Sequence, residues 1–511
     1  MSKVQIRLLQ TSDVHGYIYP RSYATLQPEN IGIAKISSLI KEYRTNNTVV
    51  IDTGDTIQGS PLTYYFSKNE IGKHPMVDVM NHINYDFVTI GNHEFNYGRE
   101  YLDGYLTNVS ATILNSNILK DGVPLYGVPY SIKVIDGVKI GFVGVTTHYI
   151  PNWEQPSVIE DLEFRDAFEA LQETVNNVRP NVDLLVVSYH GGFERDLETG
   201  LLNVDDTGEN QGYKMISEID GIDIFLSGHQ HRTLASKLNN TYYVQPSFNG
   251  TGLGMIDIEF DLDSNTFEVP FIEVLDTVGA VVDQEILSLV QDIEDKANTF
   301  LDIPVGTTSM DLLIVDQMDA RINKHPIISL INQVQMEFTG AQVSLCSLGN
   351  NVSGFNKKIT IRDLISTYIY PNVLVVKEVT GKALLQGLEK TAEFFVLKDN
   401  KIVVNDAFRT PKVQMYAYDM YDGVSYTINL QNPLGERISD VLVADVPLDI
   451  TETYSLAMNN YRASGGGDYP FYKNSKTLND TQTEIIELLI EYLYKEKDLV
   501  INHKKNIKIV Y

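Results

Sequence analysis

Short apolar runs alternate with amphipathic stretches along the N-terminal half of the chain. The apolar runs predict buried β-strands at Val4–Leu9, Thr48–Ile51, Phe87–Ile90, Leu184–Ser188 and Ile222–Leu226. Between these runs, apolar residues recur at i, i+3 and i+4, which predicts helices at Ile33–Tyr43, Pro75–Ile83 and Asp166–Val178. Alternating strands and helices are typical of an α/β fold, in which helices cover the faces of a sheet.

The pattern then changes to consecutive strands. Val134–Val145 carries Asp136-Gly137 between two apolar runs, which favours a β-hairpin. Three further apolar stretches would complete a pair of sheets, around Tyr242–Val244, Gly254–Phe260 and Thr266–Val274.

A charged stretch with helical periodicity, Asp283–Leu301, separates this region from the rest of the chain. A second, α+β pattern begins near Ile303, and the apolar end of His503–Tyr511 predicts a terminal strand. We therefore predict a first domain at residues 1–282, a linker helix at 283–302 and a second domain at 303–511.

Composition and charge limit the classes of function. The chain is 43% hydrophobic and 21% charged, an ordinary globular balance, and its formal charge is −27. Because a surface this acidic repels nucleic-acid backbones and anionic membranes, neither is an expected partner. An anionic substrate would need bound cations to invert the local field. The single cysteine, Cys346, excludes an intrachain disulfide and is interpreted as a core residue.

The N-terminal sequence contains no apolar signal-peptide core, and no run of about 18 apolar residues occurs. The sequence as given therefore predicts a cytoplasmic protein, and a monomer is the default expectation. An extracellular or cell-wall form stays open if an export signal originally preceded this sequence.

Short polar clusters follow the five predicted strands. These clusters are Asp13-Val14-His15, Asp52-Thr53-Gly54-Asp55, Gly91-Asn92-His93-Glu94, Tyr189-His190-Gly191 and Gly228-His229-Gln230-His231. Ligands of layered α/β folds bind beyond the carboxyl ends of the strands, so the clusters should meet in one cleft. Their Asp, Asn and His side chains offer oxygen and nitrogen donors to divalent metals.

The spacing within the clusters supports this interpretation. Donors two residues apart on an extended segment point the same way, as expected for Asp13 with His15 and for His229 with His231. Glycines before Asp55, Asn92 and His229 would permit tight turns. Each cluster alone is a weak signal, since Gly-Asp and Asp-x-His pairs are common in turns.

The clusters are informative as a set, because they contain five of the ten histidines. The remaining histidines lack such a context and are assigned structural or surface roles: His74, His82, His148, His325 and His503. The sequence therefore predicts a metal-binding cleft.

The cluster order D-x-H, G-D, G-N-H-E, H and G-H-x-H resembles that of the calcineurin-like metallophosphoesterases. From Ile6 to Pro470 the chain resembles the bacterial group of 5′-nucleotidases, UDP-sugar hydrolases and 2′,3′-cyclic-nucleotide phosphodiesterases. This resemblance implies a four-layer α/β/β/α catalytic domain with a dinuclear metal centre. A helix would join it to a C-terminal α+β domain that binds the nucleotide substrate.

The resemblance also implies a ligand set for two divalent ions. One ion would be held by Asp13, His15, Asp55 and His231, and the other by Asp55, Asn92, His190 and His229. Asp55 would bridge them at the ~3.5–4 Å separation typical of two-metal hydrolysis, in which an activated water attacks phosphorus in line. Mn²⁺ and Zn²⁺ are expected, with Co²⁺ and Mg²⁺ compatible. His93 resembles the family's catalytic histidine, which is not a ligand and stabilises developing charge.

Two departures from the 5′-nucleotidase pattern bear on the substrate. Asn96 stands where those enzymes carry an aspartate paired with the catalytic histidine, so we include Asn96 with His93 as catalytic. The stretch Ser347–Phe355 lacks the arginine of their substrate motif. Both departures resemble the 2′,3′-cyclic-nucleotide 2′-phosphodiesterase/3′-nucleotidase branch, as do Leu330–Gln335, Thr360–Leu364 and Asn459–Ala463.

The same resemblance suggests which residues of the C-terminal domain bind substrate. Two aromatic rings sandwich the base in the family, and the matching positions are Tyr418, with Tyr421 as an alternate, and Tyr461. Stacking contributes ~1–3 kcal/mol per base. Asn350 and Asn351, and Gly466 within a glycine run that lets backbone approach the ligand, complete the predicted substrate site.

The sequence thus predicts a metal-dependent phosphoesterase that prefers 2′,3′-cyclic nucleotides and 3′-nucleotides. A 5′-nucleotidase or UDP-sugar hydrolase on the same scaffold stays open. A non-catalytic nucleotide-binding protein is the alternative from another class, although the intact ligand set speaks against it. A phosphoprotein phosphatase would share the metal motifs but would not need the C-terminal tyrosines.

Overall fold

The computed structural model describes residues 3–511 except 71, 203–206, 369, 371 and 411–412. The chain divides into two units, Met1–Asn298 and Thr299–Tyr511. Among the described residues, no helix has the length and apolar character needed to cross a bilayer.

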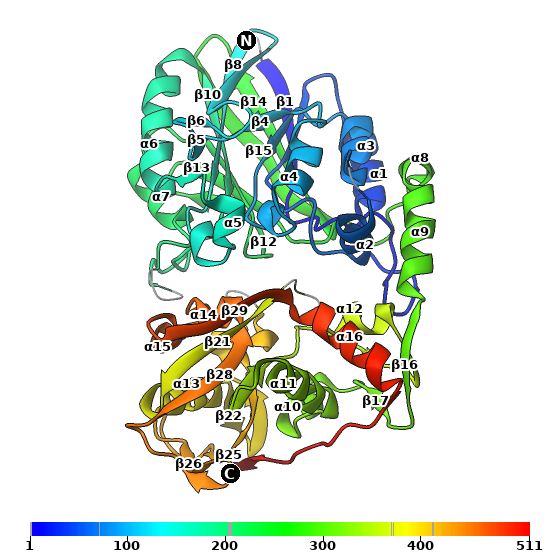
Figure 1. Cartoon of the computed structure of the whole chain (residues 1–511). Coiled ribbons are helices and arrows are strands. Elements are labelled where there is room, and N and C mark those ends of the chain that lie inside the picture. Colours follow the sequence, from blue (N-terminus) through cyan, green and yellow to red (C-terminus); the bar gives the residue numbers. More distant parts are fainter. Residues whose placement is uncertain (1–2, 71, 203–206, 369, 371, 411–412) are drawn as a thin grey trace. The chain divides into compact units, whose positions relative to one another are not determined.

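Two six-stranded sheets pack face to face in the first unit (Figure 1). The first sheet runs in the order β15 (Thr266–Asp276), β14 (Gly252–Asp261), β1 (Lys3–Thr11), β2 (Thr48–Asp52), β3 (Phe87–Thr89) and β4 (Thr112–Leu114). The second runs in the order β12 (Thr233–Leu238), β13 (Thr241–Pro246), β11 (Ile224–Ser227), β10 (Leu184–His190), β8 (Val138–Thr146) and β7 (Tyr130–Ile135). One apolar core takes side chains from both sheets, including Leu8, Ile51, Val186 and Ile256.

Helices cover the outer faces of the two sheets, which gives the expected α/β/β/α layers. They are α1 (Ile33–Tyr43), α2 (Pro61–Asn69), α3 (Pro75–Ile83), α4 (Arg99–Leu106), α5 (Pro156–Ile159), α6 (Ala167–Val178) and α7 (Gly212–Glu218). Helices α6 and α7 lie outside β8 and β10 in Figure 1, and a second core forms where they pack on these strands. Because β10 is covered on both faces, all seven of its residues are buried.

The predicted strands and helices of the first unit are present within two residues of their expected ends, except that the hairpin predicted at Val134–Val145 begins four residues earlier, at Tyr130. Helix α6 begins one residue late because the side chain of Asp166 accepts a hydrogen bond from the amide of Glu169 and caps the helix. The β7–β8 hairpin turns at Asp136 and Gly137, with φ of 47° and 94°, as the sequence predicts. A small sheet of β5 (Ile118–Lys120), β6 (Val123–Pro124) and β9 (Glu163–Phe164) was not expected.

The predicted linker helix is two helices, α8 (Gln284–Leu289) and α9 (Gln291–Leu301), because Val290 between them has a non-helical backbone with ψ of 11°. Helix α9 is attached to the first unit through the buried carboxylate of Glu294. This carboxylate accepts a hydrogen bond of 2.7 Å from the hydroxyl of Tyr23 and pairs with Arg21.

The second unit is α+β, as predicted. Its main sheet runs in the order β24 (Met420–Asp422), β18 (Val343–Cys346), β28 (Thr453–Asn459), β21 (Val373–Thr380) and β29 (Lys476–Glu484). A four-stranded sheet contains β27 (Val446–Pro447), β26 (Ile438–Val443), β25 (Val424–Asn429) and the predicted terminal strand β31 (Ile507–Val510). Smaller sheets contain β20 (Lys358–Thr360), β16 (Pro304–Thr308) and β30 (Asp498–Leu499), then β17 (Leu312–Leu313) with β19 (Gly354–Phe355), and β22 (Phe395–Lys398) with β23 (Lys401–Val404).

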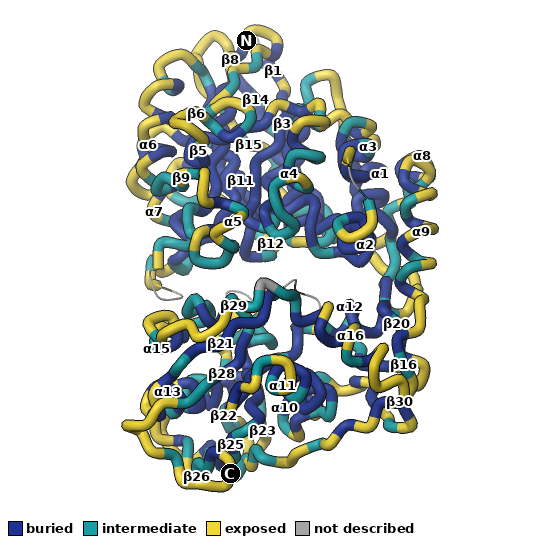
Figure 2. The backbone as a smooth tube through the Cα atoms, viewed as in Figure 1, coloured by how far each residue is buried: buried dark blue, intermediate teal, exposed yellow. Residues whose placement is uncertain are grey.

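The helices of this unit are α10 (Gln317–Ile322), α11 (Pro326–Thr339), α12 (Ile361–Thr367), α13 (Gly381–Ala392), α14 (Asn460–Ala463), α15 (Pro470–Lys473) and α16 (Ile485–Glu496). Figure 2 shows buried backbone along the central strands of each unit and exposed backbone on connecting loops. Cys346 at the end of β18 is buried, as expected for a core residue.

Candidate metal centre

Five strand ends of the first unit bring the predicted donors together. Asp13 and His15 follow β1, Asp55 follows β2, Asn92 follows β3, His190 ends β10, and His229 and His231 follow β11. All seven donor residues are described by the structure, and of their side chains only that of His231 is more than one-tenth exposed. Donors from two different sheets thus lie in one place.

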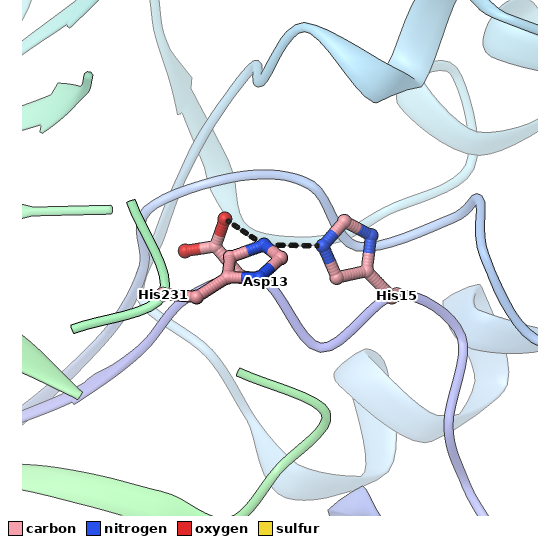
Figure 3. Close-up of side chains that lie close together, drawn as sticks. All are labelled: Asp13, His15 and His231. Atoms are coloured by element: carbon pink, nitrogen blue, oxygen red, sulfur yellow. Dashed lines mark hydrogen bonds and ion pairs between the residues drawn. The ribbon is translucent and has the colours of Figure 1, made fainter. Parts of the chain in front are cut away.

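The first group of donors consists of Asp13, His15 and His231, whose donor atoms all lie within 4.8 Å of one another. The Nε2 atoms of the two histidines are 3.0 Å apart, and Nε2 of His231 is 3.5 Å from Oδ1 of Asp13. Figure 3 shows these three side chains pointing toward one another. The ring of Phe248 stacks on His231 at 4.6 Å and fixes its plane.

The second group consists of Asp55, His190 and His229, again within 4.8 Å. Nε2 of His190 lies 3.1 Å from Oδ2 of Asp55. The side-chain oxygen of Asn92 completes the cluster, 3.0 Å from Nε2 of His190 and 2.9 Å from Nδ1 of His229. The predicted donors thus lie in two groups, and the binding of one ion by each group and the bridging role of Asp55 stay predictions.

The outward-facing nitrogens of three histidines have fixed acceptors. Nδ1 of His15 is 2.8 Å from the carbonyl of Gln58, and Nδ1 of His190 is 2.7 Å from that of Thr53. Nε2 of His229 is 2.8 Å from a carboxylate oxygen of Glu209. An acceptor on one ring nitrogen places the proton there and leaves the lone pair of the other for a metal ion. These contacts fit a site built for divalent cations.

The backbone explains how neighbouring donors converge, and it corrects the sequence interpretation. Asp13 and His15 have φ of 54° and 52°, and His229 and His231 have φ of 68° and 57°. These residues are in the left-handed conformation beyond the strand ends, so strand periodicity does not orient them. Non-glycine residues in this region are strained by about 1–3 kcal/mol each and cluster at functional sites.

The three glycines have two different roles. Gly54 has a φ of 97°, as expected for a tight turn. Gly91 and Gly228 do not have positive φ. A Cβ at Gly91 would lie 2.3 Å from Oδ1 of Asp55, and one at Gly228 would lie 2.2 Å from Oγ of Ser12. At these two positions, glycine allows close packing of the ligand loops.

The buried acids make the site suited to cations. Burial raises the pKa of Asp13 to about 7, and the neighbouring charge of Asp55 contributes to the shift. Burial lowers the pKa of His190, but the carboxylate of Asp55 outweighs this and raises it to about 10. A proton held between Asp55 and His190 and a bound divalent cation are alternative ways to compensate the same buried negative charge.

Glu94 holds the ligand loops together, a role that the sequence motif did not reveal. Its buried carboxylate accepts hydrogen bonds from the amides of Asp55, Thr56 and Gly91. The loops that carry Asp55 and Asn92 are therefore attached to one side chain.

His93 lies beside the donors without joining either group. Its amide donates to Oδ1 of Asp55 at 2.8 Å, and its Nδ1 lies 2.6 Å from the side-chain oxygen of Asn96. The predicted pair of His93 and Asn96 is therefore in contact. Asn96 also donates to Glu154 at 3.0 Å.

In the second unit, the predicted substrate residues do not share one environment. Tyr418 is fully buried, with the rings of Phe394 and Phe395 at 5.4 and 4.7 Å. This is the environment of a core residue and argues against Tyr418 as a stacking surface. Its alternate, Tyr421, is equally buried.

Tyr461, on α14, is half-buried. A Cβ at Gly466 would lie 2.5 Å from its ring, so Gly466 is needed for backbone to pack on Tyr461. Asn350 holds the loop before Tyr416: its amide donates to the carbonyl of Val413, and its oxygen accepts from the amide of Met415. Asn351 is exposed.

Three residues near the metal donors were missed by sequence reasoning: Glu209, Trp153 and Glu154. Glu209 accepts from His229, and the ring of Trp153 stacks on that of His229 at 5.6 Å. None of the three lies in a strand-end cluster, and the only signal was that Trp153 is the single tryptophan.

Comparison with known proteins agrees with this geometry. Residues 6–233 match the calcineurin-like phosphoesterase family, and residues 304–474 match the 5′-nucleotidase C-terminal domain. A crystal structure of a putative 5′-nucleotidase from Staphylococcus aureus shares 35% sequence identity and a TM-score of 0.93, covering 99% of this chain and 100% of that one.

Two sequence relatives carry activities in their names. The chain is 27% identical to the 2′,3′-cyclic-nucleotide 2′-phosphodiesterase/3′-nucleotidase of Salmonella typhimurium, over 91% of this chain and 82% of the relative. It is 25% identical to the trifunctional nucleotide phosphoesterase protein YfkN of Bacillus subtilis, over 97% of this chain. The match spans only 38% of YfkN, well under half of its length.

Proposed function

Because the chain belongs to the 5′-nucleotidase family of calcineurin-like phosphoesterases, we propose that it hydrolyses nucleotide phosphoesters at a two-metal centre. Its preferred substrates are 2′,3′-cyclic nucleotides and 3′-nucleotides. The observation that carries the proposal is the meeting of two donor groups, Asp13–His15–His231 and Asp55–His190–His229, from strand ends of two sheets.

The residues of the chain have separable tasks in this reaction. The two groups, with Asn92, would hold divalent ions, which bind phosphoryl oxygens and lower the pKa of a water molecule. Asp55 fixes the loop of His93 by accepting its amide hydrogen. His93 then stabilises negative charge that develops on the phosphoryl and leaving-group oxygens.

The proposed substrate preference is supported by Asn96 and by the loop around Asn350. Asn96 contacts His93 at the position where 5′-nucleotidases typically carry an aspartate. Asn350 uses its side chain to hold the backbone of Val413 and Met415. Its own stretch, Ser347–Phe355, lacks the arginine of the 5′-nucleotidase substrate motif. The named activity of the Salmonella relative agrees with this preference.

Tyr461 is the proposed stacking surface for the base, and Tyr416 replaces Tyr418 as its candidate partner. Both adjoin Arg462: its guanidinium carbon lies 5.4 Å from the ring centre of Tyr461, and its Nη2 donates to the carbonyl of Tyr416. Tyr416 is half-buried, unlike the fully buried Tyr418.

The proposal is tested by initial rates with added Mn²⁺ on 2′,3′-cyclic AMP, 3′-AMP, 5′-AMP and UDP-glucose. The Asp55→Asn variant, measured beside the wild type, assigns any activity to this site. The proposal expects kcat/KM for the cyclic and 3′ substrates to exceed the others by about tenfold, or about 1.4 kcal/mol in transition-state free energy.

The other outcomes are equally informative. Higher kcat/KM on 5′-AMP or UDP-glucose would keep the metal chemistry and overturn the substrate preference. Metal-loaded protein without turnover of any of the four would favour a non-catalytic nucleotide-binding protein.

A further inference from the structure

A line of three side chains leads away from the metal centre through His93. Nδ1 of His93 lies 2.6 Å from Oδ1 of Asn96, and Nδ2 of Asn96 donates to Oε2 of Glu154 at 3.0 Å. Glu154 is 58 positions from Asn96 in sequence and belongs to no motif. Nothing in the family resemblance gives Glu154 a role.

The chemistry of these groups determines the direction of each hydrogen bond. An ionised carboxylate only accepts hydrogen bonds, so Glu154 must face the NH₂ group of Asn96. The oxygen of Asn96 then faces His93. Since that oxygen is an acceptor, Nδ1 of His93 must carry a hydrogen, and in the neutral ring Nε2 keeps the lone pair.

Glu154 is itself held in place. Its second oxygen, Oε1, accepts a hydrogen bond of 2.9 Å from the amide of Gln155. The preceding residue, Trp153, stacks against His229, with an interplanar angle of 26°. One short segment after the 3₁₀ turn Ile150–Asn152 therefore contacts both a metal donor and the support of His93.

We infer that Glu154 is a positioning residue that acts through Asn96 to hold the His93 ring with a hydrogen on Nδ1. Nε2 is then the nitrogen left for the substrate, and in the protonated ring it donates its hydrogen to the phosphoryl and leaving-group oxygens. An aspartate next to the histidine would impose the same tautomer directly. In this chain the carboxylate of Glu154 contacts Asn96 instead of His93, and the oriented amide of Asn96 selects the tautomer of His93. The expected effect on turnover rests on the proposed catalytic role of His93, whereas the expected effect on its tautomer does not.

The decisive comparison is between Glu154→Ala and Glu154→Gln. Glutamine has one side-chain oxygen, which can accept from Asn96 and keep its amide in its orientation if the hydrogen bond from the amide of Gln155 is given up, whereas alanine removes both acceptors. Glu160→Ala, an exposed carboxylate in the same segment, is the matched control. Bound metal is quantified in each variant, to exclude loss of the centre.

The first measurement is the tautomer of His93, from ¹⁵N–¹H long-range correlation spectra of the full chain labelled at histidine, with His93→Ala to assign the signal. We expect protonated Nδ1 in the wild type, Glu154→Gln and Glu160→Ala, and a shift toward protonated Nε2 in Glu154→Ala. An unchanged tautomer in Glu154→Ala overturns the inference.

The second measurement is steady-state turnover of bis(p-nitrophenyl) phosphate, a general phosphodiester. Glu154→Ala should lower kcat by at least about tenfold with KM within about twofold, since a misplaced tautomer impairs the chemical step. Glu154→Gln should recover most of kcat. Equal losses in both variants, with normal metal content, would overturn the inference.

These two measurements separate the inference from the proposed function. If wild-type protein with bound metal hydrolyses no phosphoester, the proposed function fails, and the tautomer comparison alone decides the role of Glu154.

Discussion

The Nε2 atom of His229 lies 2.8 Å from Oε1 of Glu209, on the opposite edge of the ring from the nitrogen that faces the metal centre. Such a carboxylate–histidine pair orients a metal ligand and increases its basicity. Glu209 is half-exposed, so it contributes through direction more than through charge.

Glu209→Gln should therefore weaken metal binding by about 10–100-fold while kcat at saturating metal stays closer to the wild-type value. Competition with a chromophoric chelator measures the affinity. Glu198→Gln, which changes an exposed glutamate in the preceding loop, is the control and should bind metal normally. Equal affinities in the two variants would exclude this role for Glu209.

Metal binding should change the fluorescence of Trp153. This residue is the only tryptophan of the chain, and its ring stacks on His229 at 5.6 Å. Titrating chelator-treated protein with Zn²⁺ should give a saturable change in emission, reversed by excess chelator. His229→Ala should abolish the change and His82→Ala, at a surface histidine, should retain it. A signal that is unaffected by His229→Ala would place the metal elsewhere.

Tyr461→Ala should raise KM for nucleotides by about 5–150-fold and leave kcat nearly constant, because stacking contributes about 1–3 kcal/mol to binding. Tyr416→Ala should act in the same direction if this ring is the partner surface. A nucleotide-free substrate, p-nitrophenyl phosphate, is the control, and its KM should not change. Parallel increases for both substrates would indicate damage to the fold.

The ion pair of Arg462 with Asp419 stabilises the support of Tyr461. Both residues are 1% exposed, and Nε of Arg462 lies 2.7 Å from Oδ2 of Asp419. Asp419→Asn should lower the free energy of unfolding by about 3–5 kcal/mol, since it leaves a buried guanidinium without its counter-charge. Urea unfolding followed by circular dichroism measures the loss. Lys390→Gln, which removes a partly exposed ion pair with Glu393, should cost about 1 kcal/mol or less.

Stability should depend on pH through His74. Burial lowers its pKa from 6.5 to about 3, and both ring nitrogens already have partners: Nδ1 accepts from the amide of Met76, and Nε2 contacts the hydroxyl of Tyr101. The neutral ring is therefore the native form. The contribution of His74 to the free energy of unfolding is complete above pH 6.5 and is lost as the pH falls toward 3, because the unfolded chain takes up a proton that the folded chain excludes.

The comparison with His74→Asn isolates this effect, because asparagine can still cap α3. The difference in unfolding free energy between wild type and variant should fall by about 2 kcal/mol from pH 7 to pH 5. Denaturant unfolding at both pH values measures it. A pH-independent difference would show that His74 titrates normally.

Periodicity was sufficient to predict the alternating strands and helices of the first unit. Buried strands such as β10 are continuous apolar runs, and helices such as α6 have a cap and a repeating apolar face. These signals are local, so they are readable without tertiary structure. The break at Val290 was missed because α8 and α9 share one amphipathic pattern that continues through it.

The donors were predicted for a similar reason: Asp13, Asn92 and His229 stand next to strand ends, and strand ends of layered sheets meet. The left-handed turns that aim Asp13 and His229 had no counterpart in sequence. The prediction of Tyr418 as a stacking residue failed because its position in a motif does not reveal that Phe394 and Phe395 enclose its ring.

The sequence by itself determined the kinds of donor, their order along the chain and the strands that precede them, since these follow from residue type and local periodicity. Only the tertiary structure decided which groups support the donors and the neighbouring His93–Asn96 pair. Glu209 reaches His229, and Glu154 reaches Asn96, across 20 and 58 positions of chain. Such hydrogen bonds depend on where loops meet after folding, and that meeting has no periodic signature.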